Sequence, residues 1–484
     1  MPVVQWRFDN TYTRLPRLFY SKQGAVAAPA PKLVILNHAL AADLGLDFSG
    51  MDDAALAALF SGKVLPEGAE PFAQAYAGHQ FGGFSLLGDG RALMLGEHVA
   101  PDGRRVDIQF KGSGPTRYSR SGDGRAALGP MLREYVISEA MQALGIPTTR
   151  SLAVVATGQP VYRERPLPGA VLTRVAASHL RVGTFQYAAA QGDPALVATL
   201  VEYALDRHYP HLKDAASPGL ALLQAVGERQ LALVVEWLRV GFIHGVMNTD
   251  NVTIAGETID YGPCAFMDAH DPTTVFSSID HQGRYAFGNQ PRIMLWNLAR
   301  FAESLLPSID ADGERAVELA TAVLHELADI FEAGWLAMMG RKLGLSGSEP
   351  DDRALCDDLL SWMTQARADH TNTFRALAVD GLPSGAVFDD PAFGEWHARW
   401  RARLARQGDV LPAVFERMRV ANPAYIPRNH QVEAALAAGS TGDLGPMHRL
   451  LEVLAEPYAA RDGLDDYAQP AVPDGRVYQT FCGT

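Results

Sequence analysis

The chain reads Phe242-Ile243-His244-Gly245-Val246-Met247-Asn248-Thr249-Asp250-Asn251-Val252-Thr253-Ile254 near its middle, and Thr258-Ile259-Asp260-Tyr261-Gly262 shortly afterwards. This pattern predicts a loop, a short strand, a tight turn at Gly256 and a second strand that ends at Asp260. Asn251 and Asp260 would then face one another across a hairpin and share a hard cation. Oxygen ligands of this kind suit magnesium, with nucleotide phosphates completing the coordination shell.

The same segment follows the order of a protein-kinase catalytic loop, with one displacement. Kinase loops place the catalytic aspartate two residues after a histidine and an asparagine five residues beyond it. Here the residue two positions after His244 is Val246, which cannot accept a proton. An aspartate occurs instead at Asp250, directly before Asn251. Compared with a kinase catalytic loop, the sequence therefore keeps the residues that would bind a metal, but its candidate base occurs at a different position.

A lysine and a glutamate further upstream point to the same chemistry. Lys111 ends a predicted strand over 106–111, a position where a lysine in isolation would simply meet solvent. Glu134 lies among apolar side chains of a predicted helix over 129–145. An unpaired buried carboxylate is strongly disfavoured, so we expect a cation beside it. Kinases use a strand lysine and a helical glutamate in this way to hold nucleotide phosphates.

Two glycine-rich segments flank the strand that carries Lys111. Gly88-Asp89-Gly90-Arg91 precedes the predicted strand over 92–97, and Gly122-Asp123-Gly124-Arg125 follows Lys111. Glycines let backbone N–H groups approach a phosphate, and arginine suits bidentate phosphate contact. Gly-Asp-Gly is also a common hairpin turn, so the glycines alone are a weak signal. Arg117 and Arg120 lie in the same region, and the cluster indicates a local anion site.

The order of predicted elements indicates an α+β fold. Strands are expected at 92–97, 106–111, 151–157 and 171–175, with the one helix over 129–145 between them. Helical periodicity then dominates at 195–205, 219–240, 292–305, 313–345, 352–377, 392–406 and 430–456, and a short helix is expected near 52–60. A β-rich half followed by a helical half is the order of a protein-kinase-like bilobal fold. Order alone leaves a generic pair of α+β domains open.

These elements suggest a division of the chain. We expect an N-terminal extension over 1–75, a β-rich nucleotide-binding lobe over 76–188, a helical lobe over 189–456 and a C-terminal tail over 457–484. The helical lobe would carry the catalytic and metal-binding hairpin.

Composition excludes several classes of protein. The 484 residues are 48% hydrophobic, which is enough for a large core without disulfides. A formal net charge of −13 argues against nucleic-acid and membrane-surface partners. The sequence predicts no signal peptide and no membrane span. With only three cysteines, a cytoplasmic protein is expected.

Four stretches resemble the selenoprotein O family of pseudokinase-like protein adenylyltransferases. They are Tyr76-Ala77-Gly78-His79-Gln80-Phe81-Gly82, Gln109-Phe110-Lys111-Gly112-Ser113-Gly114, His244-Gly245-Val246-Met247-Asn248-Thr249-Asp250-Asn251 and Pro427-Arg428-Asn429-His430. The resemblance runs from about Asn10 to the C-terminus. It implies a kinase-like fold that binds ATP turned around relative to kinases, so that AMP is transferred to Ser, Thr or Tyr hydroxyls of protein substrates.

The resemblance also implies roles for individual residues. Asp250 would be the proton acceptor, and Asn251 and Asp260 would bind magnesium, with manganese as the alternative ion. Glu134 would support Lys111. The residues implied to contact the nucleotide are Gly88, Gly90, Arg91, Lys111, Asp123, Gly124, Arg174, Arg181 and Asp260.

The cysteines suggest a redox hypothesis. The family carries selenocysteine or cysteine near its C-terminus, and Cys482 has the matching place here. Cys264 lies four residues after Asp260, so we expect it at the rim of the metal site. A reversible Cys264–Cys482 bridge would pin the tail across the active site. The alternative is that all three thiols, including Cys356, are inert.

Two other functions stay open on the residues. A phosphotransferase of the ordinary kinase type is disfavoured by Val246. A catalytically inert, nucleotide-binding pseudokinase scaffold would have no need of Asp250 beside Asn251.

Overall fold

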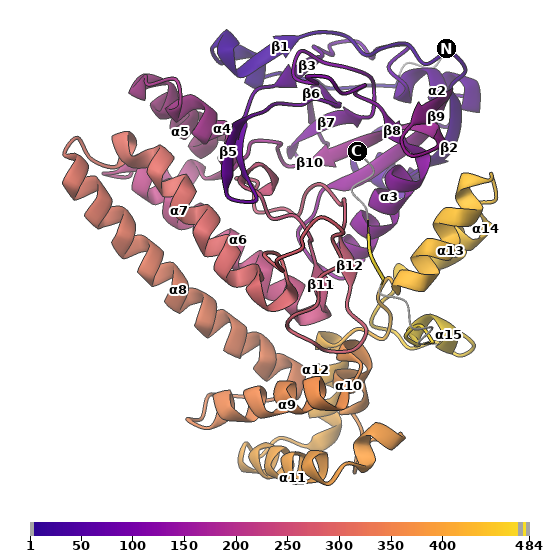
Figure 1. The fold of residues 1–484 in the computed structure, drawn as a ribbon, viewed down its shortest axis with the longest axis vertical. Coiled ribbons are helices and arrows are strands. Elements are labelled where there is room, and N and C mark those ends of the chain that lie inside the picture. Colours follow the sequence, from indigo (N-terminus) through magenta and orange to yellow (C-terminus); the bar gives the residue numbers. More distant parts are fainter. Residues whose placement is uncertain (1–3, 473–477, 481–484) are drawn as a thin grey trace.

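The computed structural model describes residues 4–472 and 478–480 and has the mixed α and β structure predicted. Strands gather in the first part of the chain and helices in the rest, in the two-lobed order of a protein-kinase-like fold (Figure 1). The strands are β1 (Tyr20–Lys22), β2 (Lys32–Leu36), β3 (Phe72–Gln74), β4 (Ala77–Gln80), β5 (Gly83–Leu86), β6 (Ala92–Val99), β7 (Arg105–Lys111), β8 (Ala126–Ala127), β9 (Arg150–Tyr162), β10 (Pro166–Ala176), β11 (Phe242–Ile243) and β12 (Ala265–Phe266).

The α-helices lie between and after these strands. They are α1 (His38–Asp43), α2 (Asp53–Phe60), α3 (Leu128–Ala143), α4 (Val182–Ala189), α5 (Pro194–His208), α6 (Pro218–Val240), α7 (Gln290–Ile309), α8 (Gly313–Leu343), α9 (Asp352–Ala366), α10 (His370–Ala376), α11 (Pro391–Arg406), α12 (Leu411–Ala421), α13 (Asn429–Ser440), α14 (Gly445–Leu454) and α15 (Asp465–Ala468). None of the helices described combines the length and apolar character that a membrane crossing requires.

The large sheet is antiparallel, with the order β1-β3-β6-β7-β10-β9-β2 and β8 paired with β10. Side chains alternate between its two faces. Along β7, Val106, Ile108 and Phe110 therefore enter the apolar core that the sheet shares with α1 and α2. Lys111 lies on the opposite face, where α3 packs against the sheet. The predicted alternation thus aims Lys111 at α3.

The long helix α6 leads directly into the segment quoted first. It ends at Gly241, whose φ of 73° is the left-handed conformation that glycine adopts readily. β11 follows at once and pairs with β12. Helices α7 and α8 pack along α6, and α8 to α12 extend away from the sheet (Figure 1). The catalytic-loop segment is thereby held between the buried end of α6 and the sheet.

The predicted hairpin over 252–260 is not formed. Its two arms do not pair with each other: Thr253 forms an antiparallel bridge with Arg181, and Thr258 forms a parallel bridge with Thr148. The turn is closed instead by the Thr253 side chain, whose hydroxyl donates to the Glu257 carbonyl and accepts from the Glu257 N–H. The short arms therefore gain their partners from the sheet half of the molecule.

Two predicted helices are each split in the structure. The helix predicted over 352–377 breaks at Arg367, which has a φ of 51°, and α10 restarts with Asp369 as its N-cap. The helix predicted over 430–456 breaks near Gly442, which has a φ of 98°. Helices α1, α4, α12 and α15 were not predicted from the sequence. α1, α4 and α15 have eight residues or fewer, which is too short to show a clear helical period.

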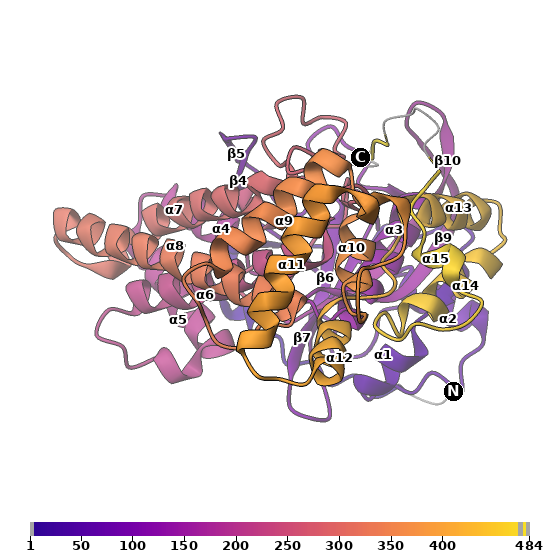
Figure 2. The same ribbon diagram turned by 90° about the horizontal axis from the view of Figure 1, so that it is seen from below.

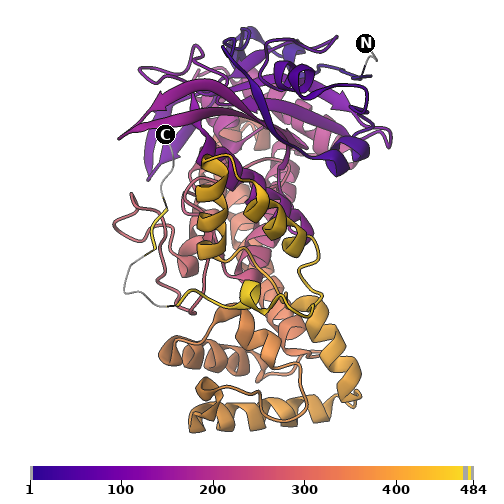
Figure 3. The same cartoon turned by 90° about the vertical axis from the view of Figure 1, so that its right-hand side faces the viewer.

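The C-terminal part of the chain returns to the sheet half. Helices α13 and α14 pack on α3 (Figure 3). Just before α13, the fully buried Arg428 guanidinium contacts Asp268 at 2.7 Å and Asp369 at 2.7 Å. The side-chain amide of Asn429 donates to the Phe266 carbonyl and accepts from the Phe266 N–H. The Pro427–His430 motif therefore ties the C-terminal helices to the segment that follows the catalytic loop.

The division into an extension, two lobes and a tail remains a proposal. Strands β1, β2 and β3 all lie before residue 76, yet they belong to the same sheet as β6 and β7. At the other end, Thr480 forms a parallel bridge with Ser277. Both ends of the chain thus pack on the central parts.

Candidate active site

An open cleft of about 520 Å³ lies between the sheet and the catalytic-loop segment. It gathers side chains from the glycine-rich segments, β7, β10 and the loop after β11. All of the residues predicted to contact nucleotide or metal line it, and these are Gly88, Gly90, Arg91, Lys111, Asp123, Gly124, Arg174, Arg181, Asn251 and Asp260, together with Asp250. The structure therefore brings together residues that are up to 172 positions apart, from Gly88 to Asp260.

Four charged side chains form a network at the inner end of the cleft. The Lys111 ammonium lies 2.8 Å from the Glu134 carboxylate and 2.6 Å from the Asp260 carboxylate. The Arg174 guanidinium also contacts Glu134, and it lies 2.7 Å from the same Asp260 oxygen. The predicted Lys111–Glu134 ion pair is thus present, and Arg174 is a second partner that periodicity along the strand did not reveal.

The network shifts the acidity of both carboxylates in the same direction. Burial alone would raise the pKa of Glu134, but Arg174 and Lys111 outweigh it and the net pKa is lowered. Burial likewise opposes the charged form of Asp260, while Lys111, Arg174 and Arg91 hold its pKa well below the usual value. Both carboxylates are therefore charged at neutral pH. Removing one member of such a buried group leaves another charge unpaired, which typically costs about 3–5 kcal/mol.

Arg181 forms a second buried ion pair beside this network. Its guanidinium lies 3.2 Å from the Asp89 carboxylate and 4.3 Å from the centre of the Tyr76 ring. Asp89 also accepts a hydrogen bond from the Gln74 N–H at 3.0 Å. Asp89 and Tyr76 were not predicted as site residues. The position of Asp89 inside the glycine-rich segment was the only signal for it.

Asp250 is partly buried and lies against the ribbon formed by β4 and β5. Its Oδ1 atom is buried and has no hydrogen-bond partner in the described part of the chain. Burial raises the pKa of Asp250 to about 6, with Asp260 adding to the rise and Arg181 opposing it. An unpartnered buried carboxylate oxygen is costly unless a ligand or a proton satisfies it. Asp250 therefore has the environment of a proton acceptor that is completed by a substrate.

Asn251 and Asp260 both face the cleft, although not across a hairpin. The Asn251 side-chain amide donates to the Val246 carbonyl at 3.0 Å, which leaves its oxygen free to face the cleft. Asp260 has a φ of 63°, which is unusual for a residue other than glycine. That backbone conformation turns its carboxylate toward Lys111 and Arg174. Two oxygen donors from different segments thus face one space.

The outer rim of the cleft is built from the glycine-rich segments. Asp123 is exposed and lies 3.0 Å from the Arg163 guanidinium, a rim residue that the sequence did not reveal. Gly88 has a φ of 149°, and a Cβ there would lie 2.4 Å from the Tyr118 ring. A side chain at position 88 would therefore clash with the loop itself, in addition to any obstruction of a bound ligand.

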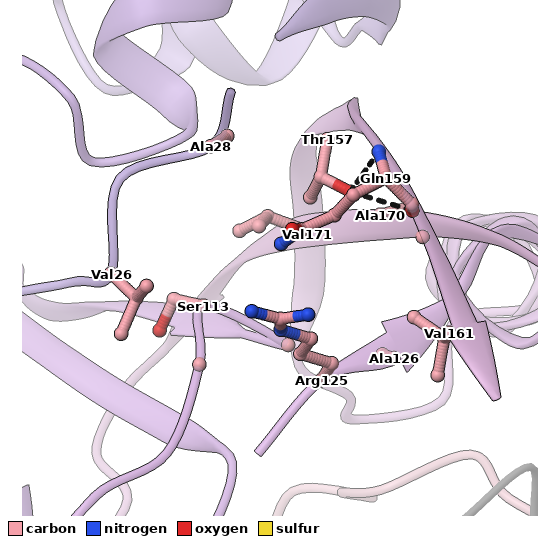
Figure 4. A pocket seen from close by; sticks show the side chains of 13 residues that line it. Val26, Ala28, Ser113, Arg125, Ala126, Thr157, Gln159, Val161, Ala170 and Val171 are labelled. Atoms are coloured by element: carbon pink, nitrogen blue, oxygen red, sulfur yellow. Dashed lines mark hydrogen bonds between the residues drawn. The ribbon is translucent and has the colours of Figure 1, made fainter. Parts of the chain in front are cut away.

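A smaller hollow lies behind the same segments and includes Ser113, Arg125 and Thr157 (Figure 4). The hydroxyl of Thr157 accepts from the Gln159 N–H there. The volume of this hollow is about 10 Å³, which is close to the space of one water molecule. It cannot hold a nucleotide, so the open cleft is the candidate site.

The arginines predicted to crowd this region separate in the structure. Arg125 lines the cleft, whereas Arg120 donates to the Leu86 carbonyl on β5. Arg117 does not line the cleft.

Cys264 does not lie at an exposed rim. Its side chain is buried, and burial raises the pKa of its thiol to about 12. The prediction that Cys264 lies at the rim of the metal site was wrong, because the chain turns inward after Asp260 to form β12 and Cys264 does not line the cleft. Cys482 lies outside the described residues.

A three-residue cluster fastens the β4–β5 ribbon to the catalytic loop. The Thr249 hydroxyl accepts from the His79 N–H at 2.7 Å and donates to the Gln186 side chain at 2.7 Å. Gln186 Nε2 and His79 Nδ1 are 2.8 Å apart, which closes the ring. None of these residues was predicted as a site residue, although His79 and Thr249 lie in the stretches quoted for the resemblance.

The contact between this ribbon and Asp250 leads to a prediction. A Cβ at Gly78 would lie 2.4 Å from Asp250 Oδ1, so Gly78→Ala should displace either the carboxylate or the ribbon. We expect catalytic turnover to fall at least tenfold while nucleotide affinity is kept, as measured by steady-state kinetics and calorimetric ATP titration. The matched control is Gly83→Ala, where the nearest atom is the Gln80 carbonyl oxygen at an ordinary 3.6 Å. Equal activity in the two variants would show that the contact is unimportant.

Comparison with known proteins identifies the family. Residues 2–455 match the sequence model of the family described as "Protein adenylyltransferase SelO". The chain is 57% identical over 482 residues to a "Protein nucleotidyltransferase YdiU" of Nitrosococcus oceani, covering 99% of this chain and 98% of that one. It is 58% identical to the protein of the same name from Alcanivorax borkumensis, with 99% of each chain covered.

A solved structure described as ROP2 from Toxoplasma gondii, with a protein-kinase fold and no enzymatic activity, aligns with 70% of this chain and 87% of its own. That alignment has a TM-score of 0.26 and 10% sequence identity. The family match and the two relatives extend over nearly the whole chain, including every residue that lines the cleft. The chain belongs to the SelO family of protein adenylyltransferases and is a nucleotidyltransferase.

Proposed function

We propose that the enzyme transfers AMP from ATP to Ser, Thr or Tyr hydroxyls of protein substrates, with Asp250 as the proton acceptor. The observation that carries this proposal is the buried, unpartnered Asp250 Oδ1 beside a cleft lined by Lys111, Arg174 and Arg181. A substrate hydroxyl would complete the hydrogen bonding of that oxygen. The position occupied by the base in ordinary kinases is Val246 here.

The reaction would proceed by in-line attack at the α-phosphorus. The hydroxyl oxygen forms a bond to phosphorus, its proton passes to Asp250, and the bond to the bridging oxygen breaks so that pyrophosphate leaves. A pKa of about 6 leaves Asp250 charged at neutral pH while keeping it a usable proton acceptor. This assignment supports a nucleotidyl transfer in which no separate histidine base is needed.

The charge distribution supports a reversed ATP orientation. The two buried arginines, Arg174 and Arg181, lie deep in the cleft, with 3% and 5% of their side chains exposed. They would hold the γ-phosphate inside, which turns the α-phosphorus toward Asp250. Arg91, Gly88, Gly90, Asp123 and Gly124 lie on the glycine-rich side of the cleft and would contact the remainder of the nucleotide.

The residues also fit a divalent cation. Lys111 and Arg174 are already balanced by Glu134 and Asp260, so they can orient phosphate groups but cannot neutralise the full charge of a triphosphate. No group of three or more acidic, His or Cys side chains suited to a metal occurs among the described residues. Asn251 and Asp260 would therefore hold magnesium or manganese together with phosphate oxygens. When bound, the ion would neutralise charge on the phosphates and on the leaving group.

We further propose that the C-terminal tail carries a redox control. The Thr480 hydroxyl donates to the Pro263 carbonyl at 2.6 Å, and Pro263 is the residue before Cys264. Cys482 is two residues beyond Thr480, so this contact brings the tail close to Cys264. A disulfide would need the two Cα atoms within about 7 Å. Oxidation would then fix the tail beside the segment that follows Asp260.

The transfer itself is tested with labelled ATP. We expect label from the α-phosphate to remain on protein and label from the γ-phosphate to be lost, because pyrophosphate is the leaving group. Asp260→Ala should abolish labelling through loss of a metal ligand, with folding checked by thermal unfolding. Labelling from the γ-phosphate alone would identify a phosphotransferase, and no labelling from either position would favour an inert scaffold.

The pH dependence of transfer tests the role of Asp250. Its raised pKa means that the carboxylate is charged above about pH 6 and becomes protonated as the pH falls through that value. The rate should be flat above about pH 7 and fall about tenfold per pH unit below about pH 6. Asp250→Asn should lower the rate on the order of 10²–10⁴-fold and remove this inflection. A profile that keeps the inflection in the variant would assign the base elsewhere.

The redox proposal predicts a reversible response to oxidant. Wild-type activity should change on oxidation and recover with a thiol reductant, whereas Cys482→Ala should respond to neither. Cys356→Ala, which changes a buried cysteine of α9, should behave as wild type. The same response in wild type and Cys482→Ala would exclude the tail cysteine as a switch.

A further inference from the structure

The ribbon of β4 and β5 projects from the body of the molecule beside α4 and α7 (Figure 2). It contains the motif Tyr76–Gly82, in which Tyr76, Gln80 and Phe81 line the cleft and Gly78 lies against Asp250. The transfer chemistry uses no residue of β5 itself. Its turn consists of Phe81, with a φ of 51°, and Gly82, with a φ of 88°. Two positive φ values make the tight turn that suits a two-residue hairpin.

The two edges of this ribbon have different surroundings. On β4, the His79 N–H donates to the Thr249 hydroxyl. The Ala77 carbonyl packs so closely on α4 that a Cβ added at Gly183 would lie only 2.1 Å from its oxygen. At the tip, the Phe81 N–H donates to the Asn248 side chain at 3.1 Å. The β4 edge is therefore packed on the catalytic loop and on α4, and it cannot accept another strand.

The β5 edge is open. The Leu87 N–H donates to the Tyr76 carbonyl, and hydrogen-bonded pairs alternate along an antiparallel ladder. The pairs of Phe84 with His79 and of Leu86 with Ala77 are therefore the non-hydrogen-bonded ones. The backbone N–H and C=O groups of Phe84 and Leu86 consequently point away from β4. In the described residues, the Leu86 carbonyl accepts from Arg120, which leaves the Phe84 groups and the Leu86 N–H available.

Exposed apolar side chains accompany this open edge. Phe84 is 48% exposed and Leu86 is 54% exposed, and both project on one face because they are two residues apart. The Phe84 ring lies 5.2 Å from the His79 ring, which in turn lies 5.4 Å from Trp296 on α7. A row of aromatic rings thus runs from β5 to α7. Arg120 covers the Leu86 carbonyl, but the strand Gly83–Leu86 has no charged residue and no proline of its own. Natural proteins often use charge or proline to block such an edge, so its remaining open groups and exposed apolar side chains indicate an interaction site.

The surroundings of the edge are basic, although the whole chain has a net charge of −13. Arg120 and Arg284 form no ion pair with any residue in the described ranges, and Arg284 lies over the Trp296 ring at 4.8 Å. The Arg284 guanidinium also lies next to the hairpin tip, 3.9 Å from the place of a Cβ at Gly82. Charge complementarity therefore favours a partner segment with acidic residues.

We propose that β5 is a docking edge for the protein substrate, which adds an extended segment as a third strand through Phe84 and Leu86. The segment would carry apolar side chains at alternate positions and acidic residues at its ends, facing Arg120 and Arg284. This inference rests on the proposed function, because the docked protein is the AMP acceptor. Main-chain pairing would provide affinity for many sequences, and the apolar and acidic positions would select among them.

The geometry sets the distance between docking and chemistry. Gly78 on β4 touches Asp250, and a strand added to β5 would lie about two strand spacings, roughly 10 Å, from β4. An extended residue covers roughly 3.3 Å, so the modified hydroxyl should lie at least about three residues from the docked segment. Acceptor sites mapped by mass spectrometry would show this offset.

The test uses synthetic peptides of twelve residues with alternating Val and Thr. One form has Asp at both ends, a second has Lys at both ends, and a third repeats the acidic form with N-methyl groups at alternate backbone positions. Binding to the full-length protein is measured by fluorescence anisotropy without ATP. We expect the acidic peptide to bind at least tenfold more tightly than the other two. Equal affinity for all three, or no binding of the acidic peptide, would overturn the proposal.

Variants of β5 distinguish binding by strand addition from nonspecific hydrophobic binding of the peptide. Phe84→Ala removes the ring, and Phe84→Pro also removes the outward N–H without removing a hydrogen bond inside the ribbon. We expect affinity for the acidic peptide to fall in both and to fall at least threefold further with proline. Leu86→Ser is a second variant at an exposed position, and Val420→Ala on α12, 67% exposed, is the matched control. ATP affinity and thermal stability should be unchanged in all four.

The same variants distinguish failure of docking from failure of the proposed function. With α-labelled ATP, Phe84→Pro should raise KM for a protein acceptor at least tenfold with kcat little changed. If wild type transfers no α-label, the proposed function fails, and peptide binding still decides whether β5 is a docking edge. If light scattering shows that the variants change self-association and not peptide binding, the edge joins copies of this chain and the proposal is wrong.

Discussion

Four charged side chains from three regions of the chain, three of them buried and Asp260 partly buried, hold the catalytic cleft together. Lys111 and Arg174 come from neighbouring strands, Glu134 from α3 and Asp260 from the loop after α6. None can be removed without leaving another charge unpaired in a poorly solvated place. The position of α3 on the sheet and the position of the metal-binding loop are therefore coupled. A shift of either element would break two ion pairs at once.

The same balance determines what the cleft can bind. Two positive and two negative side chains leave the inner network neutral, so an added triphosphate must bring or recruit its own cations. A divalent ion between Asp260, Asn251 and the phosphates would meet this need. In the same way, Asp250 lies outside the network and retains an unpartnered oxygen. The structure thus separates carboxylates that organise charge from one that is free to accept a proton.

Two peripheral segments support this centre from opposite sides. The β4–β5 ribbon is fastened to the catalytic loop through His79, Gln186 and Thr249, so the loop cannot move without the ribbon. On the other side, α13 and α14 pack on α3, and Arg428 and Asn429 bind the segment after Asp260. Family-specific motifs without obvious chemistry therefore have a physical purpose. They hold the reacting residues by contacts between distant parts of the chain.

Much of this arrangement could be predicted from sequence, because its signals are local. Alternation along 106–111 placed Lys111 on the polar face of its strand, and helical spacing around Glu134 required a buried cation. The displaced aspartate beside Asn251 was visible directly. Arg174 as the second partner of Glu134 and the burial of Cys264 had no such local signal. They depend on which strands become neighbours and on where the chain turns inward.

The predicted hairpin shows most clearly which features can be predicted from the sequence and which depend on tertiary packing. Residue types and spacing were enough to place a turn at Gly256 and an aspartate after it, and both are present. Propensity could not determine that Thr253 would pair with Arg181 and Thr258 with Thr148. Thus the sequence by itself determined the chemical groups and the local periodicity of each element. Only the tertiary structure decided their partners, because backbone hydrogen bonds in short strands are satisfied by whichever segment packing brings alongside.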